Sequence, residues 1–265
     1  MQAEIPVYKL RQGNSPLMVS MPHTGTCLPQ WLQPRLTGEA LALADTDWHL
    51  EQLHDFLDAL DATVLVATHS RYVIDLNRPP DNASLYPGQS TTSLCPLDSF
   101  GDLPLYQDGK APDLAEVDGR IEHYWRPYHD TLSRELARLK TLHERVVLWD
   151  AHSIRSVVPR FFEGELPHLN IGSADDQSCD PALTAVLAQV AAASPYSSVA
   201  NGRFKGGYIT RRYGAPAQGV HAVQLETAMR SYMKESAPFV LDETRAAALR
   251  PVLRQMMQAA VDWAA

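Results

Sequence analysis

The sequence predicts an α/β fold in which a mixed, mostly parallel central sheet is covered by helices on both faces. Short apolar, β-branched runs alternate with longer segments whose apolar residues recur at helical spacing. Strands without polar positions are typical of parallel sheets that are buried on both faces. The length of 265 residues and the apolar fraction of 45% suit one globular domain, which we expect to span residues 1–265.

The expected strands are short apolar runs that stop at polar or turn-forming residues. They lie at 16–21, Thr63–Ala67, 72–76, 146–149, 168–171 and 220–226. Their β-branched residues favour extended backbone, and the prolines at 22, 79 and 80 end two of the runs.

The expected helices lie between these strands and at the end of the chain. They span 47–60, 113–140, 181–193 and 243–263. The first carries one apolar stripe, and the second has acids in its first turns, bases in its last turns and an expected kink at Pro127. Residues 79–112 are rich in Pro, Gly, Ser and Thr, which predicts a long loop, and such loops are often functional.

Charge and composition exclude several classes of partner. With 23 basic and 31 acidic residues the formal net charge is −8, which argues against nucleic acid or an anionic membrane as a partner. No apolar run approaches the ~20 residues that span a bilayer, and the N-terminus lacks a signal-peptide pattern. Three cysteines without a C-x-x-C pair favour reduced thiols. We therefore expect a cytoplasmic protein.

Three polar residues lie where expected strands end, namely His23, His152 and Glu226. The carboxyl ends of parallel strands share one edge of a sheet, so these residues can converge. Two histidines and a carboxylate are the usual protein ligands of a catalytic zinc, which activates water and polarises a carbonyl. The alternative is that each histidine is a satisfied structural residue.

Two acids, Asp45 and Asp47, precede the expected helix at 47–60. One interpretation makes them helix caps, since acids favour the first turn, although capping needs only one of them. The other interpretation makes one of them a metal ligand close to His23. Spacing alone favours capping.

Two basic segments indicate a site for a small anionic molecule. Arg71 and Arg78 bracket an expected strand that also carries Asp75 and Asn77, and arginine forks match carboxylates. An Arg71–Asp75 ion pair is the structural alternative. The second segment contains Arg203, Lys205, Arg211 and Arg212 around two glycines. It fits either a solvated loop or a substrate lid.

These motifs together resemble the N-formylglutamate amidohydrolase family, which includes the deformylase of histidine degradation. They are MPHTG (21–25), DTDWH (45–49), SRYVIDLNRP (70–79), DAHSI (150–154), NGRFKGGYITRRYG (201–214) and QLE (224–226). The resemblance covers residues 5–260 and implies a fold similar to the zinc carboxypeptidases and aspartoacylase. It implies hydrolysis of N-formyl-L-glutamate to formate and L-glutamate, the last step of a histidine degradation route.

The resemblance also implies a metal site. His23 and His152 match two metal ligands of those relatives, whereas Thr26 stands where they carry a second-ligand glutamate. We expect Asp47 to replace that glutamate, with Asp45 as the alternative, and Asp150 to orient a ligand. Zn²⁺ is the expected cofactor, and Co²⁺, Fe²⁺ and Mn²⁺ also accept such ligands.

The remaining roles follow from the same resemblance. Glu226 matches the general acid/base, and Arg71 matches the group that stabilises the oxyanion. Asn77 and Arg78 match the residues that bind the substrate α-carboxylate. For the side-chain carboxylate, our hypothesis is Arg203 or Arg212.

Two competing functions remain open at this point. One is a hydrolase of the same build that acts on another N-acyl amino acid or a small peptide. The other is a metal-free carboxylate-binding module that keeps both arginines at 71 and 78.

Overall fold

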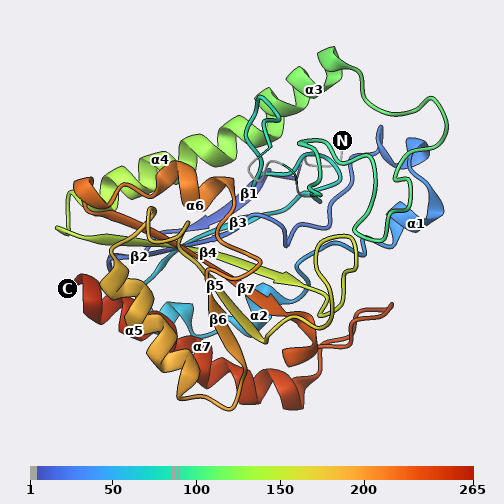
Figure 1. The fold of residues 1–265 in the computed structure, drawn as a ribbon. Coiled ribbons are helices and arrows are strands. Elements are labelled where there is room, and N and C mark those ends of the chain that lie inside the picture. The colour runs from blue at the N-terminus through green and yellow to red at the C-terminus, as the bar shows by residue number, and fades with distance from the viewer. Residues whose placement is uncertain (1–4, 85–87, 89) are drawn as a thin grey trace.

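The computed structural model describes residues 5–84, 88 and 90–265, and its centre is a seven-stranded sheet (Figure 1). The strands are β1 (Tyr8–Arg11), β2 (Leu17–Met21), β3 (Thr63–Ala67), β4 (Val146–Ile154), β5 (Leu169–Gly172), β6 (Ser198–Ala200) and β7 (Val220–Ala228). Their order in the sheet is β1-β3-β2-β4-β7-β5-β6. Because β2 pairs with β3 on one side and β4 on the other, the chain reverses its direction of progress there, which is where α/β sheets bind ligands.

Most strand pairs are parallel, as the sequence predicts. The four central strands β3, β2, β4 and β7 run in one direction. The edge strand β1 is antiparallel to β3, and β5 is antiparallel to β7. The last strand, β6, is parallel to β5. The expected mixed, mostly parallel sheet is therefore confirmed.

Helices cover both faces of this sheet (Figure 1). They are α1 (Gly38–Leu41), α2 (Leu50–Leu53), α3 (Leu114–Arg120), α4 (Arg126–Lys140), α5 (Pro181–Ala192), α6 (Tyr208–Tyr213) and α7 (Glu243–Ala264). Side chains of α4 and α6 pack on one face, and those of α2, α5 and α7 pack on the other. No helix of the described residues is long and apolar enough to cross a membrane.

The alternation of side chains along the strands builds the two cores. In β2, Met18 packs under α4, while its neighbours Leu17 and Val19 pack on the α7 side. Successive side chains of a strand point to opposite faces, so a strand that is buried on both sides must be apolar throughout. This explains why the runs at 17–19, 64–67 and 146–149 show no polar alternation.

The predicted strand at 72–76 is wrong, because this segment forms consecutive turns. Val73 N donates to Ser70 O at 2.9 Å, and Asn77 N donates to the Asp75 side chain at 2.8 Å. Aspartate stabilises such turns by accepting from the backbone two residues later. The run is apolar because it is buried, and burial alone does not distinguish a strand from a turn.

The predicted helix at 47–60 is also wrong as a continuous element. Only α2 and a 3₁₀ turn at Leu57–Leu60 are helical, and His49 has a positive φ of 62° before α2. A left-handed residue cannot continue a right-handed helix, so the helix begins after it. The apolar stripe is nevertheless real, since Leu50, Leu53 and Leu57 all join the core under α7.

The long helical segment at 113–140 is confirmed, with α3 and α4 joined by a π-helical turn at Ile121–Trp125. Pro127 follows this turn at the start of α4, where its missing N–H costs no helical hydrogen bond. The other expected helices correspond to α5 and α7. Strands β4 and β7 continue past the predicted ends at 149 and 226.

His129 on α4 joins this helix to the turns at 72–78 and to α6. Its Nε2 donates to Leu76 O at 2.8 Å, and its Nδ1 lies 2.9 Å from the Tyr213 hydroxyl. Burial lowers the pKa of this imidazole to about 3, although the bond to Leu76 O opposes the shift. In the unfolded chain this imidazole is therefore protonated as the pH falls through about 6.5, whereas in the folded protein it stays neutral.

We predict that His129 makes stability fall as the pH drops below about 6.5, with a slope of about 1.4 kcal/mol per pH unit. Since glutamine does not titrate, the stability difference between wild type and His129→Gln should narrow from pH 7 to pH 5. Urea unfolding at each pH measures this difference, and His123→Gln, on an exposed histidine of the same helical segment, is the control. A His129→Gln difference that stays constant over this range would contradict the prediction.

Candidate metal centre and catalytic cavity

The three sequence-predicted residues His23, His152 and Glu226 converge at the carboxyl edge of the sheet. His23 lies two residues beyond the end of β2, and the other two are in-register neighbours on the parallel strands β4 and β7. All three line one cavity, together with Asp47 and Arg71. The parallel direction of β2, β4 and β7 is therefore what brings together residues that are far apart in the sequence.

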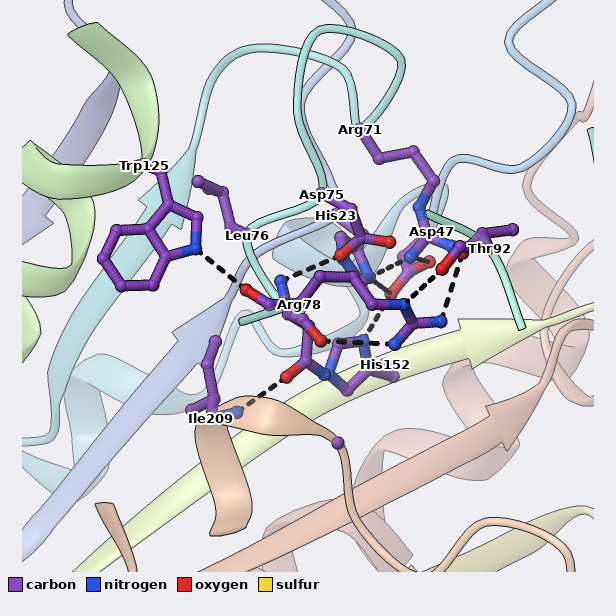
Figure 2. Close-up of polar contacts among 12 residues, drawn as sticks. His23, Asp47, Arg71, Asp75, Leu76, Arg78, Thr92, Trp125, His152 and Ile209 are labelled. Atoms are coloured by element: carbon purple, nitrogen blue, oxygen red, sulfur yellow. Dashed lines mark hydrogen bonds and ion pairs between the residues drawn. The ribbon is translucent and has the colours of Figure 1, made fainter. Parts of the chain in front are cut away.

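His23, Asp47 and His152 are arranged as a set of metal ligands. Asp47 Oδ2 lies 3.0 Å from His152 Nδ1 and 3.8 Å from His23 Nδ1 (Figure 2). One ligand atom from each residue falls within 4.8 Å of the others, and all three side chains are buried. Asp47 N also donates to His23 O at 3.0 Å, which fixes the aspartate beside the histidine.

The opposite nitrogen of each imidazole is held by a carboxylate. His23 Nε2 lies 2.7 Å from Asp75 Oδ1, and His152 Nε2 lies 3.0 Å from Asp150 Oδ2. Metal-bound histidines usually donate their second N–H to a carboxylate in this way, which fixes the ring and the tautomer. Both Nδ1 atoms are therefore turned toward Asp47. Asp75 thus bonds to His23, in place of the ion pair with Arg71 that the sequence allowed.

The ionisable groups in this cluster shift the pKa values of one another. Burial alone would raise the pKa of Asp75, but the charges of His23 and Arg71 hold it well below its ordinary value. Burial alone would lower the pKa of His152, but the Asp150 and Asp47 carboxylates raise it well above its ordinary value. The pKa of His23 is lowered by burial and by the Arg71 guanidinium.

A divalent cation fits the donor set and the charge of this site. Five buried carboxylates gather here, those of Asp45, Asp47, Asp75, Asp150 and Glu226. Arg71 is the buried arginine among them, and its guanidinium contacts His23 Nδ1 and lies 3.6 Å from Asp47 Oδ1. The converging nitrogen and oxygen atoms thus already lie against one positive charge, the guanidinium of Arg71. Two imidazoles with one carboxylate match a catalytic zinc site.

Glu226 lines the same cavity as the three candidate metal ligands and is buried within β7. Gln224 Nε2 donates to Glu226 Oε2 at 3.2 Å, and Gln224 Oε1 accepts from Gly207 N at 2.7 Å. Burial raises the pKa of Glu226 to about 8, with Asp47 adding to the shift and His152 opposing it. A cation nearby favours the charged form of a carboxylate, so a bound metal would counter this shift. The hydrogen bond from Gln224 to Glu226 is not among the sequence predictions. The position of Gln224 two residues before Glu226 nevertheless places both side chains on one face of the strand.

Asn77 and Arg78 both line the cavity, as the sequence predicts. Asn77 Nδ2 donates to Asp150 Oδ2 at 3.3 Å, and its Oδ1 accepts from Ile209 N at 2.8 Å. Arg78 is oriented by Thr92, whose carbonyl and hydroxyl oxygens accept from it at 2.9 and 3.1 Å (Figure 2). The predicted long loop therefore positions one of the predicted substrate-binding groups.

The basic segment at 201–214 divides into two parts with different surroundings. Arg203 lines the cavity, and its Nε donates to Phe161 O at 2.5 Å. Arg212 is exposed on α6 and does not belong to the cavity lining. A Cβ at Gly207 would overlap the Asn77 side chain, so glycine lets this segment dock against the site. Of the two candidate arginines, the structure brings only Arg203 to the site.

Asp45 and Asp47 take separate positions, and neither caps a helix. The residue that precedes α2 is His49, and its side chain makes no capping bond. Asp47 joins the histidines, whereas Asp45 accepts from Tyr72 and from the backbone of Phe100. The capping interpretation is therefore wrong for both acids, and Asp47 is the aspartate placed for metal ligation.

Comparison with known proteins finds one matching family model and two similar sequences. The family model described as N-formylglutamate amidohydrolase matches residues 15–233. The chain is 50% identical over 258 residues to an N-formylglutamate deformylase of Pseudomonas aeruginosa, covering 97% of each chain. It is 49% identical over 260 residues to an N-formylglutamate deformylase of Pseudomonas putida, covering 98% of this chain and 97% of that one.

Two solved structures share the fold over almost the whole chain. The crystal structure of N-formylglutamate amidohydrolase from Ralstonia eutropha aligns with a TM-score of 0.84 at 24% identity, covering 98% of both chains. A gene product of Agrobacterium tumefaciens aligns with a TM-score of 0.75 at 21% identity, covering 99% of this chain and 98% of that one. At these identities the likeness establishes the fold.

We predict that Asp75→Asn weakens metal binding by roughly 10–100-fold, because the amide carries no charge to hold the His23 imidazole. Competition with a chromogenic chelator measures the dissociation constant of Zn²⁺. Asp58→Asn, which alters an exposed acid paired with Arg11, is the control and should bind as wild type does. An unchanged affinity in Asp75→Asn would show that this carboxylate does not support a metal ligand.

Proposed function

The chain belongs to the N-formylglutamate amidohydrolase family and hydrolyses N-formylglutamate, and we propose that it does so with a divalent metal ion held by His23, Asp47 and His152. One observation carries this proposal: two histidines, each held from behind by a carboxylate, turn their Nδ1 atoms toward a buried aspartate beside Glu226. We propose Zn²⁺ because this donor set is typical of catalytic zinc sites. Co²⁺, Fe²⁺ and Mn²⁺ accept the same nitrogen and oxygen ligands.

In the proposed reaction, Glu226 and Arg71 act on the formyl group. When bound, the metal ion supplies Lewis-acid polarisation of the carbonyl and acidification of water. Glu226 takes a proton from the attacking water, whose oxygen bonds to the formyl carbon. Arg71 donates to the oxygen on which negative charge develops, a contribution of about 3–4 kcal/mol for one well-placed donor. Glu226 then passes the proton to the nitrogen as the C–N bond breaks, which yields formate and glutamate.

The substrate carries two carboxylates, and two arginines line the cavity besides Arg71. Arg78 lines it from the side of the turns at 75–78, and we propose that this residue, with Asn77 beside it, binds the α-carboxylate. Arg203 lines the cavity from the segment before α6, and we propose that it binds the side-chain carboxylate. Arginine forks bind carboxylates through paired hydrogen bonds, which also fix the orientation of the substrate.

We predict that Glu226→Gln lowers kcat for formate release from N-formyl-L-glutamate by a factor on the order of 10²–10⁴, because the amide cannot accept the proton of water. Formate is measured enzymatically with metal-loaded protein, and the bound metal is quantified in the same samples. Glu39→Gln, on an exposed acid of α1, is the control. A kcat near that of wild type at equal metal content would remove Glu226 from this role.

We predict that Arg203→Ala raises KM for N-formyl-L-glutamate roughly tenfold or more, since a hydrogen bond to a charged group contributes about 1.5–3 kcal/mol. The neutral analogue N-formyl-L-glutamine should be affected much less, because it lacks the side-chain carboxylate. Arg212→Ala removes an exposed arginine of α6 and is the matched control. Equal effects of both variants on both substrates would contradict the assignment.

A further inference from the structure

One wall of the cavity is apolar and contains a residue of the long loop. Phe100, Ile154, Phe161 and Phe204 all line the cavity, and Phe100 belongs to the segment 79–112. The Phe100 and Phe161 rings meet edge to face with their centroids 5.0 Å apart, a favourable arrangement for aromatic pairs. Phe100 is 8% exposed, so the ring is held within the protein.

The Phe100 ring also lies against the group that is proposed to bind the reacting oxygen. The central carbon of the Arg71 guanidinium is 4.9 Å from the centroid of this ring, a cation–π contact. Phe100 and Arg71 line the same cavity, so an acyl group whose oxygen accepts from Arg71 lies in the space that this ring bounds. The substituent on that carbon is a hydrogen atom in a formyl group and a methyl group in an acetyl group. The ring is therefore placed to distinguish them.

A buried carboxylate fixes Phe100 in this position. Asp45 Oδ2 accepts from Phe100 N at 2.8 Å and from the Tyr72 hydroxyl at 2.9 Å. Asp45 is 2% exposed, and Arg155 lies 3.8 Å from its other oxygen. Tyr72 is the chain neighbour of Arg71, so Asp45 holds the backbone of Phe100 and the side chain of the residue next to this arginine. Asp45 thus ties the long loop to the segment that supplies Asp47.

We propose that Phe100 is a specificity-determining residue that limits the acyl group to a single carbon, and that Asp45 is a positioning residue that acts through Phe100. This inference rests on the proposed function, because Arg71 locates the acyl oxygen there. A rigid ring next to the acyl carbon excludes a methyl group by overpacking, which well-packed sites tolerate poorly. We call the Phe100 ring, which lies next to the acyl group, the acyl wall. Of the two aspartates in the motif at 45–47, Asp45 then positions the acyl wall and Asp47 binds the metal.

The test compares kcat/KM for N-formyl-L-glutamate and N-acetyl-L-glutamate in metal-loaded protein. In Phe100→Ala the acetyl-to-formyl ratio should rise at least about tenfold over wild type, since one methyl group in a pocket typically changes selectivity by 10–200-fold. Leu166→Ala is the matched control, because Leu166 is buried in the same apolar cluster but does not line the cavity. An unchanged or lower ratio in Phe100→Ala would overturn the proposal. If thermal melting shows that Phe100→Ala does not fold, Phe100→Leu replaces it, with a smaller rise expected.

The positioning role of Asp45 has its own readout. Asp45→Asn keeps an oxygen that accepts from Phe100 N, and should retain the wild-type ratio. Asp45→Ala should raise the ratio, and adding Asp45→Ala to Phe100→Ala should change it no further. A loss of kcat in Asp45→Ala with no change in the ratio would show a merely structural role.

The failure of this inference is distinguishable from the failure of the proposed function. If wild type releases formate and the ratio does not respond to Phe100→Ala, only the acyl-wall assignment falls. If metal-loaded wild type releases no formate, the proposed function falls and the acyl-wall assignment falls with it.

Discussion

The structure depends on the balance of charge at the carboxyl edge of the sheet, where several carboxylates are buried beside two histidines and one buried arginine. Burying an ionised carboxylate is costly unless it is paired and hydrogen-bonded. Asp75 and Asp150 meet this condition by bonding to the imidazoles of His23 and His152. Those bonds leave both Nδ1 atoms facing Asp47, so the pairing that stabilises the buried acids also orients the ligands. A metal ion would complete the balance, which links the stability of this region to its chemistry.

The groups of this site come from two kinds of element, parallel strands and the turns and loops around them. Parallel β2, β4 and β7 bring their carboxyl ends to one edge, so the histidines and Glu226 stand on rigid strands or directly after one. The groups proposed to contact the substrate lie instead on turns and loops, where Thr92 orients Arg78 and Gly207 lets the Arg203 segment approach Asn77. Gln224 connects that segment to Glu226, and the long loop supplies Phe100 beside Arg71. Strands thus hold His152 and Glu226, whereas turns and loops supply Asp47, Arg71 and the groups that shape the space around the substrate.

Sequence patterns predicted the sheet and the convergence of His23, His152 and Glu226, because apolar runs that end in polar residues are a local signal. The turns at 72–76 were predicted as a strand, since an apolar run reports burial and not backbone conformation. The helix at 47–60 was predicted as continuous because its apolar residues recur at regular helical spacing. His49 takes a left-handed conformation, which no local sequence pattern indicates. The pairing of Asp75 with His23 and of Asp45 with Phe100 was not predictable. These contacts join residues 52 and 55 positions apart through turns, where no periodicity sets the register.

We propose that hydrolysis depends on a metal ion held by His23, Asp47 and His152. The most direct test is a titration of chelator-stripped protein with Zn²⁺, in which bound metal and the rate of formate release from N-formyl-L-glutamate are measured at each addition. We expect the rate of formate release to rise in proportion to metal binding and to level off at one ion per chain. We also expect Asp47→Ala to need far higher Zn²⁺ concentrations to bind the ion. Undiminished formate release by the stripped protein, or wild-type affinity in Asp47→Ala, would contradict the claim.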